Sequence, residues 1–142
     1  MPEVTPAVEL TLTWTTGLAF SARDDNRGTE WVVDGKNEAG PSPVILVGSA
    51  VAGCMGIDIV HILTRGRFEV RAMNAEFEGY RAEIDPRRYT RIDLHFVIDT
   101  TAPADQVARA IQMSRDKYCS VWQSMRQDIE FTTSFTITTA AQ

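Results

Sequence analysis

One long apolar stretch constrains this chain more than any other feature. Residues 43–65 read PVILVGSAVAGCMGIDIVHILTR, and Asp58 and His61 are the only acidic or basic side chains before Arg65. A surface helix normally combines an apolar stripe with a polar opposite face. A helix over this stretch would be apolar on nearly every side, so we expect it to be covered on nearly every side.

The ends of this helix are marked by residues that commonly begin and end helices. Ser42 is a suitable N-cap and Pro43 suits the first helical position. The helix should end near Thr64, because a cation and a glycine follow there as Arg65-Gly66. The length would also allow a membrane span. The two polar side chains and the many small residues favour a core helix, and we expect no membrane partner.

The length, the net charge and the N-terminal segment of the chain limit the classes of function that it can have. The chain has 142 residues and a formal net charge of −5, which predicts one soluble domain over residues 1–142 and argues against a nucleic-acid partner. The N-terminal segment MPEVTPAVELTLTW lacks the basic and apolar regions of a signal peptide, so we expect a cytoplasmic protein. In a reducing compartment its two cysteines are not expected to form a structural disulfide.

The remaining sequence predicts an α+β fold with mostly antiparallel sheet packed on helices. Alternation is clearest at residues 90–100, where Ile92, Leu94, Phe96 and Ile98 share one face. Residues 21–28 form a predicted loop, and Thr101 is a possible cap for a second helix. The other predicted strands are 8–20, 29–34, 68–81 and 130–139. The inner stripe predicted for the second helix is Val107, Ala110, Ile111 and Ser114, and a short helix is predicted to follow as far as Arg126.

The two cysteines are the first candidates for chemistry. Cys54 lies mid-helix among small neighbours, whereas Cys119 lies at a predicted helix start. A cysteine on an apolar helix is commonly a small buried hydrophobe. Helix N-termini lower a thiol pKa, so this argument alone makes Cys119 the nucleophile. Cys54 would need a cation from elsewhere to ionise.

Other polar residues give weaker signals. Cys54 and His61 are seven residues, or ~10 Å, apart along a helix, so they cannot touch within it. Asp58 would raise a thiol pKa rather than lower it. We expect both residues to be satisfied by backbone or by a partner subunit. A site built from Cys54, His61, His95 and Cys119 has no recognised metal-ligand spacing, so neither a metal nor a cofactor is expected.

Arg23 and Arg27 are candidate cations for a thiolate, because both lie in the predicted loop. Arg23, which precedes Asp24-Asp25, is preferred. Solvent exposure is the alternative for both.

The segments SPVILVGSAVAGCMGIDIVHIL and RDKYCSVWQSM, with RRYTRIDLHFVI between them, resemble the OsmC/Ohr family. This is the family of osmotically inducible protein C and organic hydroperoxide resistance protein. The residues of these segments are closer to those of the OsmC-like branch of the family, and the resemblance covers about residues 40–138.

The resemblance implies an intertwined homodimer in which antiparallel sheets enclose the cysteine helices and the active sites lie at the subunit interface. It implies an antioxidant enzyme that reduces organic hydroperoxides. Cys54 matches the peroxidatic cysteine, which becomes a sulfenic acid, and Cys119 matches the resolving cysteine. A lipoyl-type dithiol would reopen the disulfide, and Arg23 would stabilise the thiolate.

One departure leaves a second interpretation open. Family peroxidases carry a glutamate just after the helix-opening proline, where this chain has Val44 and Ile45. Glu38 precedes the helix at a different spacing. The alternative is therefore a non-peroxidase dimer that binds a small apolar ligand, with cysteines for packing or redox sensing. A thioesterase-like domain also suits a wrapped helix, but no acid or base is suitably placed on it.

Overall fold

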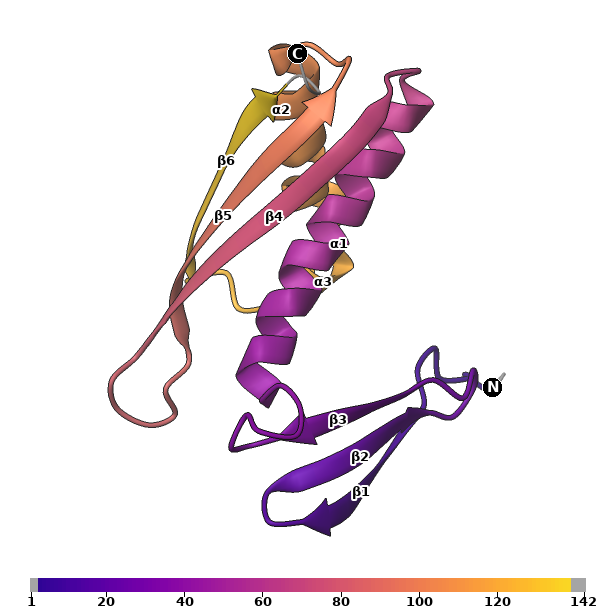
Figure 1. Ribbon diagram of the computed structural model, residues 1–142, viewed down its shortest axis with the longest axis vertical. Helices are drawn as coiled ribbons and strands as arrows, with labels where there is room; N and C mark the ends of the chain where they lie inside the picture. The colour runs from indigo at the N-terminus through magenta and orange to yellow at the C-terminus, as the bar shows by residue number, and fades with distance from the viewer. Residues whose placement is uncertain (1–2, 139–142) are drawn as a thin grey trace. The chain divides into compact units, whose positions relative to one another are not determined.

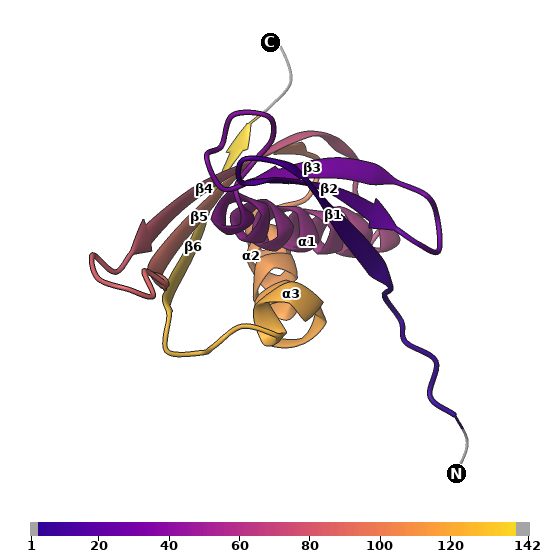
Figure 2. The ribbon, with the colours of Figure 1, turned by 90° about the horizontal axis from the view of Figure 1, so that it is seen from below.

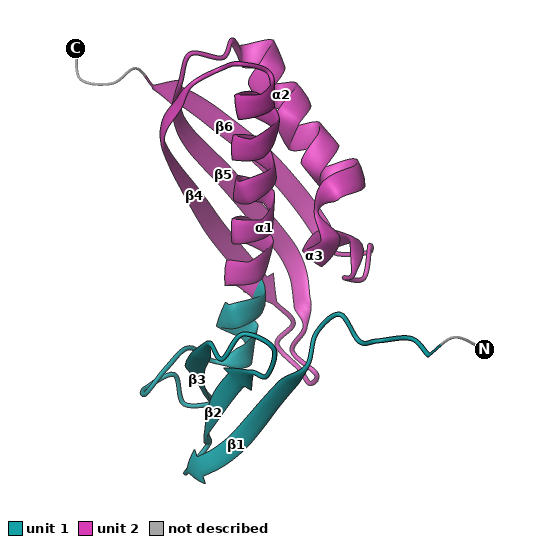
Figure 3. Ribbon diagram, turned by 90° about the vertical axis from the view of Figure 1, so that its right-hand side faces the viewer, with its two compact units in different colours: residues 1–47 teal, residues 48–142 magenta. Residues whose placement is uncertain are grey.

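The computed structural model describes residues 3–138 and divides into two compact units, Met1–Val47 and Gly48–Gln142 (Figure 3). The long helix α1 (Pro43–Arg65) begins in the first unit and continues through the second. Its bounds match those predicted from the sequence. The strands are β1 (Leu10–Thr16), β2 (Ala19–Asp24), β3 (Glu30–Asp34), β4 (Val70–Arg81), β5 (Tyr89–Thr100) and β6 (Glu130–Thr138). The remaining helices are α2 (Ala104–Met113), the π-helix η1 (Ser114–Tyr118) and α3 (Ser120–Gln123).

Unit 1 is an antiparallel sheet in the order β1-β2-β3. The prediction of one strand over residues 8–20 was wrong, because the chain reverses at Gly17 with φ of 57°. A positive φ is readily adopted by glycine, which has no Cβ to clash. The predicted loop over residues 21–28 was also partly wrong. Its first four residues belong to β2, so Arg23 is a strand residue paired with Thr11 and Glu30.

Unit 2 contains a sheet in the order β4-β5-β6 with its helices on one face (Figures 1 and 2). β4 and β5 are antiparallel, whereas β6 runs parallel to β5. A parallel neighbour requires a crossover, which α2, η1 and α3 provide. The alternation predicted for β5 is confirmed: Ile92, Leu94, Phe96 and Ile98 are buried in the core of this unit.

α1 packs one face into this core. Val51, Met55, Ile59 and Leu63 are buried at four-residue intervals, the spacing of one helical face. On another face Ile57 is 71% exposed. By length and composition α1 could cross a membrane, but this buried stripe is that of a helix packed on a sheet.

α2 confirms the predicted inner stripe, since all four of its members are buried. The cap prediction was wrong: the N-cap is Pro103, which offers no side-chain cap. The hydroxyl of Thr101 instead accepts the backbone N–H of Glu69 at 2.8 Å. Thr101 therefore ties the start of β4 to the end of β5 rather than starting a helix.

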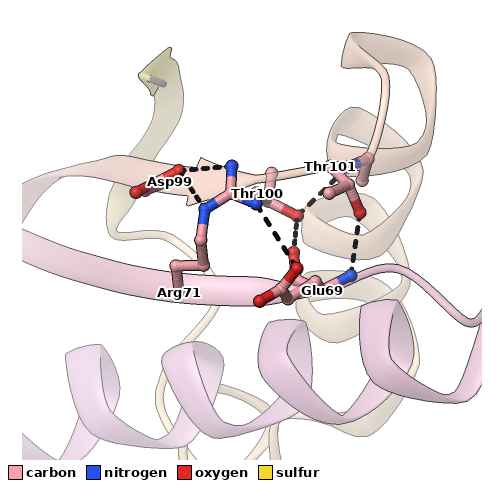
Figure 4. Close-up of polar contacts among 6 residues, drawn as sticks. Glu69, Arg71, Asp99, Thr100 and Thr101 are labelled. Carbon is pink, nitrogen blue, oxygen red and sulfur yellow. Dashed lines mark hydrogen bonds and ion pairs between the residues drawn. The ribbon is translucent and has the colours of Figure 1, made fainter. Parts of the chain in front are cut away.

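An ion pair strengthens this end of the sheet (Figure 4). The guanidinium of Arg71 lies 2.8 Å from the carboxylate of Asp99, which is 8% exposed. The hydrogen bond to Asp99 raises the pKa of Arg71. Thr100 adds a hydroxyl that donates to the carbonyl of Glu69 at 2.6 Å. These contacts hold the strand ends from which α2 departs.

Candidate functional site: two thiols between α1 and α3

α1 carries Cys54 at the margin of the unit 2 core. The residue is half-buried and packs against the buried cluster. Its sulfur lies 3.9 Å from the hydroxyl oxygen of Ser120, the residue after Cys119. The site therefore joins two segments far apart in the sequence. Ser120 was not singled out as a candidate because only the fold brings it to Cys54.

Cys119 is held at the junction of η1 and α3. Its backbone N–H donates to the carbonyl of Ser114 at 2.7 Å, the long-turn bond of a π-helix. Its sulfur accepts the backbone N–H of Trp122 at 3.3 Å, so Cys119 is the N-cap of α3. The Trp122 ring packs edge-on against Phe131, with ring centroids 4.4 Å apart. π-Helical turns often occur at functional sites.

The two thiols differ in environment. Cys119 is fully buried, and burial raises the pKa of its thiol to about 11. The adjacent Cys54 side chain adds to this rise, because a negative charge on one thiol opposes ionisation of the other. Both cysteines are free thiols.

The helix-start argument for Cys119 as nucleophile is therefore wrong. α3 is only four residues long, so few peptide dipoles oppose the cost of burying a charge. The raised pKa keeps the Cys119 thiol protonated at neutral pH.

Asp58 connects η1 to α1. The buried hydroxyl of Ser114 donates to its carboxylate at 2.7 Å. Asp58 is thus satisfied by a side chain of its own chain, and not by backbone or a partner subunit as expected. Ser114 was predicted as part of the buried stripe, but its polar partner was not. An unusual serine in an apolar stripe was the available signal.

The candidate arginines lie in unit 1, whereas both cysteines lie in unit 2. Arg23 is exposed and lies 3.8 Å from Glu30 and 3.9 Å from Asp25. Arg27 lies 3.6 Å from Asp24. A role for either arginine at the thiols stays a prediction.

Neither position of the missing family glutamate is fully buried. Val44 is half-buried and Ile45 is 46% exposed. Glu38 is exposed in the loop after β3, where Asp34 accepts the backbone N–H groups of Ala39 and Lys36. These bonds, that of Ala39 foremost, lower the pKa of Asp34.

The side chain of His95 makes its hydrogen bonds with strand β6 and not with the thiols. The ring nitrogens of His95 lie 2.7 Å from the Ser134 hydroxyl and 3.0 Å from that of Thr136. Across residues 3–138, no three histidine, cysteine or carboxylate side chains gather as a metal site would require.

Comparison with known proteins places this arrangement in a family. The family model described as OsmC-like protein matches residues 35–134, which include both thiols. This chain belongs to the OsmC-like protein family. Protein YhfA of Escherichia coli is 35% identical over 129 residues, spanning 89% of this chain and 96% of YhfA.

Solved structures agree with the OsmC-like fold. A protein of Aquifex aeolicus superposes with a TM-score of 0.86 at 24% identity, covering 96% of this chain and all of that one. An organic hydroperoxide resistance protein of Elizabethkingia anophelis gives 0.70 at 14% identity, covering 96% of this chain and 100% of that one. The α+β fold class predicted from the sequence is confirmed.

Proposed function

We propose that this OsmC-like protein is a thiol peroxidase that reduces organic hydroperoxides. Its structural neighbour from Elizabethkingia anophelis is an organic hydroperoxide resistance protein, which agrees with this class of substrate. The observation that carries the proposal is the pairing of two free thiols with unequal burial. Cys54 is partly accessible, whereas Cys119 is buried beside it with its pKa raised to about 11. In such a pair the accessible thiol can react with the substrate first, and the buried thiol can then react with the oxidised form of the first.

In the first step the Cys54 thiolate attacks one peroxide oxygen and the O–O bond breaks. The alkoxide takes a proton and leaves as an alcohol, and Cys54 becomes a sulfenic acid. The Ser120 hydroxyl, 3.9 Å away, is positioned to hydrogen-bond the sulfur. Arg23 is our candidate for the cation that favours the thiolate.

In the second step Cys119 attacks the oxidised sulfur of Cys54, a disulfide forms and water leaves. Ionised Cys54 helps to hold Cys119 in its protonated form. A neutral sulfenic acid no longer exerts that repulsion, so oxidation of Cys54 itself eases ionisation of Cys119. A dithiol of the lipoyl class then reduces the disulfide by exchange.

We further propose a homodimer with active sites at its interface. A groove of about 630 Å³ runs along the exposed side of α1, lined by Gly53, Gly56, Ile57 and Val60 among others. A groove so apolar on a core helix suits a second copy of the chain. The family match crosses the boundary between the two units, which supports one domain over residues 1–142. A cytoplasmic location is part of this proposal.

The second candidate is an OsmC-like dimer that binds a small apolar ligand and lacks peroxidase activity. Val44 and Ile45, which stand where family peroxidases carry a glutamate, favour it. In that case the thiols would serve packing or redox sensing.

The deciding experiment measures consumption of cumene hydroperoxide with dihydrolipoamide as reductant. We expect turnover by the wild-type protein, none by Cys54→Ser, and a single stoichiometric turnover by Cys119→Ser. Mass spectrometry of the oxidised wild-type protein should show a Cys54–Cys119 disulfide. Equal background rates in wild type and Cys54→Ser would exclude the peroxidase and leave the ligand-binding dimer.

A further inference from the structure

A second cavity, of about 390 Å³, lies toward the C-terminal end of α1 and plays no part in the thiol chemistry. Its walls belong to unit 2 alone. They are formed by Asp58, His61, Ile62 and Arg65 of α1, Met113 of α2 and Tyr118 of η1.

Arg65 places a positive charge at this cavity. A cation at a helix C-terminus commonly serves the last carbonyl groups. Here the backbone N–H groups of residues 66–68 already donate to carbonyl groups of the last turn, each at 3.0 Å. Across residues 3–138 no carboxylate pairs with Arg65 and no hydrogen bond holds its guanidinium. The charge is available to a ligand.

Two further polar residues, His61 and Tyr118, line the same cavity, and their side chains have no hydrogen-bond partner among residues 3–138. The Lys117 ammonium lies 5.3 Å from the Tyr118 ring centre and adds positive charge nearby. Between these groups the wall is apolar, formed by Ile62 and Met113. A cavity with a cationic end and an apolar wall fits an amphipathic anion.

The opposite end of the cavity sets the direction of such a ligand. Asp58 precedes Arg65 by seven residues, or ~10 Å along the helix. Its carboxylate is held in place by the Ser114 hydroxyl at 2.7 Å. A fixed negative charge repels an anionic group, so only the uncharged end of a ligand is accommodated there.

We propose that this cavity is a binding site for a small organic monocarboxylate. The carboxylate pairs with Arg65 and accepts a hydrogen bond from Tyr118, and a hydrocarbon chain extends along Ile62 and Met113 toward Asp58. A planar guanidinium matches a carboxylate with two parallel hydrogen bonds. The site uses neither thiol and does not depend on the peroxidase proposal.

Octanoate is a suitable probe because its chain length is comparable to the span from Arg65 to Asp58. Binding to the full-length protein is measured by isothermal titration calorimetry and by shifts of backbone amide signals in NMR. We expect saturable octanoate binding that shifts amides of residues 58–65 and 113–118. Octanol, which lacks the charge, should bind about tenfold more weakly or worse.

Substitutions of single residues test which side chains bind the carboxylate of octanoate. Arg65→Gln should weaken octanoate binding by about tenfold or more, and Tyr118→Phe by several-fold, because each loses a hydrogen bond to a charged group. The matched control is Arg67→Gln, which removes an exposed arginine two residues away that does not line the cavity. It should bind octanoate as the wild type does.

Three outcomes would overturn the proposal: no saturable binding of octanoate, equal binding of octanol, or an Arg65→Gln variant that binds as tightly as wild type. Cys54→Ser should retain octanoate binding. A peroxidase-inactive protein that binds octanoate would therefore refute only the thiol chemistry, and an active protein that does not bind it would refute only this site.

Discussion

At the scale of single residues, burial decides the chemistry of the two cysteines. Cys119 is fully buried, and the pKa of its thiol is raised to about 11. Cys54 keeps access to solvent and lies beside the Ser120 hydroxyl. The difference arises from position in the fold, because both residues are free thiols of the same intrinsic chemistry.

The raised pKa of Cys119 predicts a loss of stability in alkali. The ordinary pKa of this thiol, 9.0, applies to the unfolded chain, and folding raises the pKa to about 11. Between these values the folded state binds the proton more tightly, so its stabilising effect is complete below pH 9 and disappears as pH rises to 11. The loss should be on the order of 2 kcal/mol.

Urea unfolding at several pH values across the interval between the unfolded and folded pKa of Cys119 measures this effect. Cys119→Ala is the control, because it lacks this thiol but keeps every other group that titrates at alkaline pH. The difference in unfolding free energy between wild type and variant should shrink across that interval. A difference that stays constant would mean that the folded-state pKa is not raised.

At the scale of secondary structure elements, the π-helix η1 is fixed to α1 through one hydrogen bond. The Ser114 hydroxyl donates to Asp58 at 2.7 Å, and the Ser114 carbonyl accepts the N–H of Cys119 at 2.7 Å. This single residue thus positions both the second thiol and the Asp58 end of the second cavity.

Ser114→Ala should destabilise the protein by about 1–3 kcal/mol, because a half-buried carboxylate loses its partner. Ser120→Ala provides a matched control: Ser120 is exposed and its hydroxyl makes only a 3.9 Å contact with Cys54. Its effect on the unfolding free energy should be within about 0.5 kcal/mol. Thermal and urea unfolding compare the two. Equal effects would show that the Asp58 bond does not hold η1.

The ion pair between β4 and β5 gives a second prediction at this scale. Arg71→Gln removes the partner of Asp99, a carboxylate that is nearly buried, and should lower the unfolding free energy measurably. Arg91→Gln removes an equally short pair with Asp93, at 2.7 Å, in which both side chains are more exposed. Exposed pairs contribute little, so the Arg91 variant should be the more stable of the two in urea unfolding. A reversed order would contradict the role assigned to burial.

At the scale of the whole molecule, the exposed side of α1 is a surface suited to self-association. Ile57 is 71% exposed and lines the groove along the helix. Apolar surface of this kind on a core helix is expected to be buried by association. The proposed homodimer would bury it and would explain why α1 is apolar on the side that faces away from its own sheet.

Ile57→Glu tests the dimer, because it would place a charge in the proposed apolar interface. Light scattering at micromolar concentration should find dimers for wild type and monomers for the variant. Ala104→Glu, an exposed change in the first turn of α2, should remain dimeric. A monomeric wild type would exclude the interfacial active site.

Several features could be predicted from the sequence because they depend on neighbouring residues. The bounds of α1 follow from Pro43 at one end and Arg65-Gly66 at the other. The buried face of β5 follows from strict alternation, and the two cysteine segments were enough to indicate the OsmC-like family. Periodicity, caps and motifs are local properties, so the linear order of residues carries them.

Tertiary structure decided the features that need residues from distant segments. Ser114 and Asp58 are 56 positions apart, and only the fold brings their side chains together. The position of Cys119 at a helix start suggested a thiol of lowered pKa. Burial instead raises that pKa to about 11, because the free energy of a charge depends on everything packed around it and not on its neighbours in the chain alone.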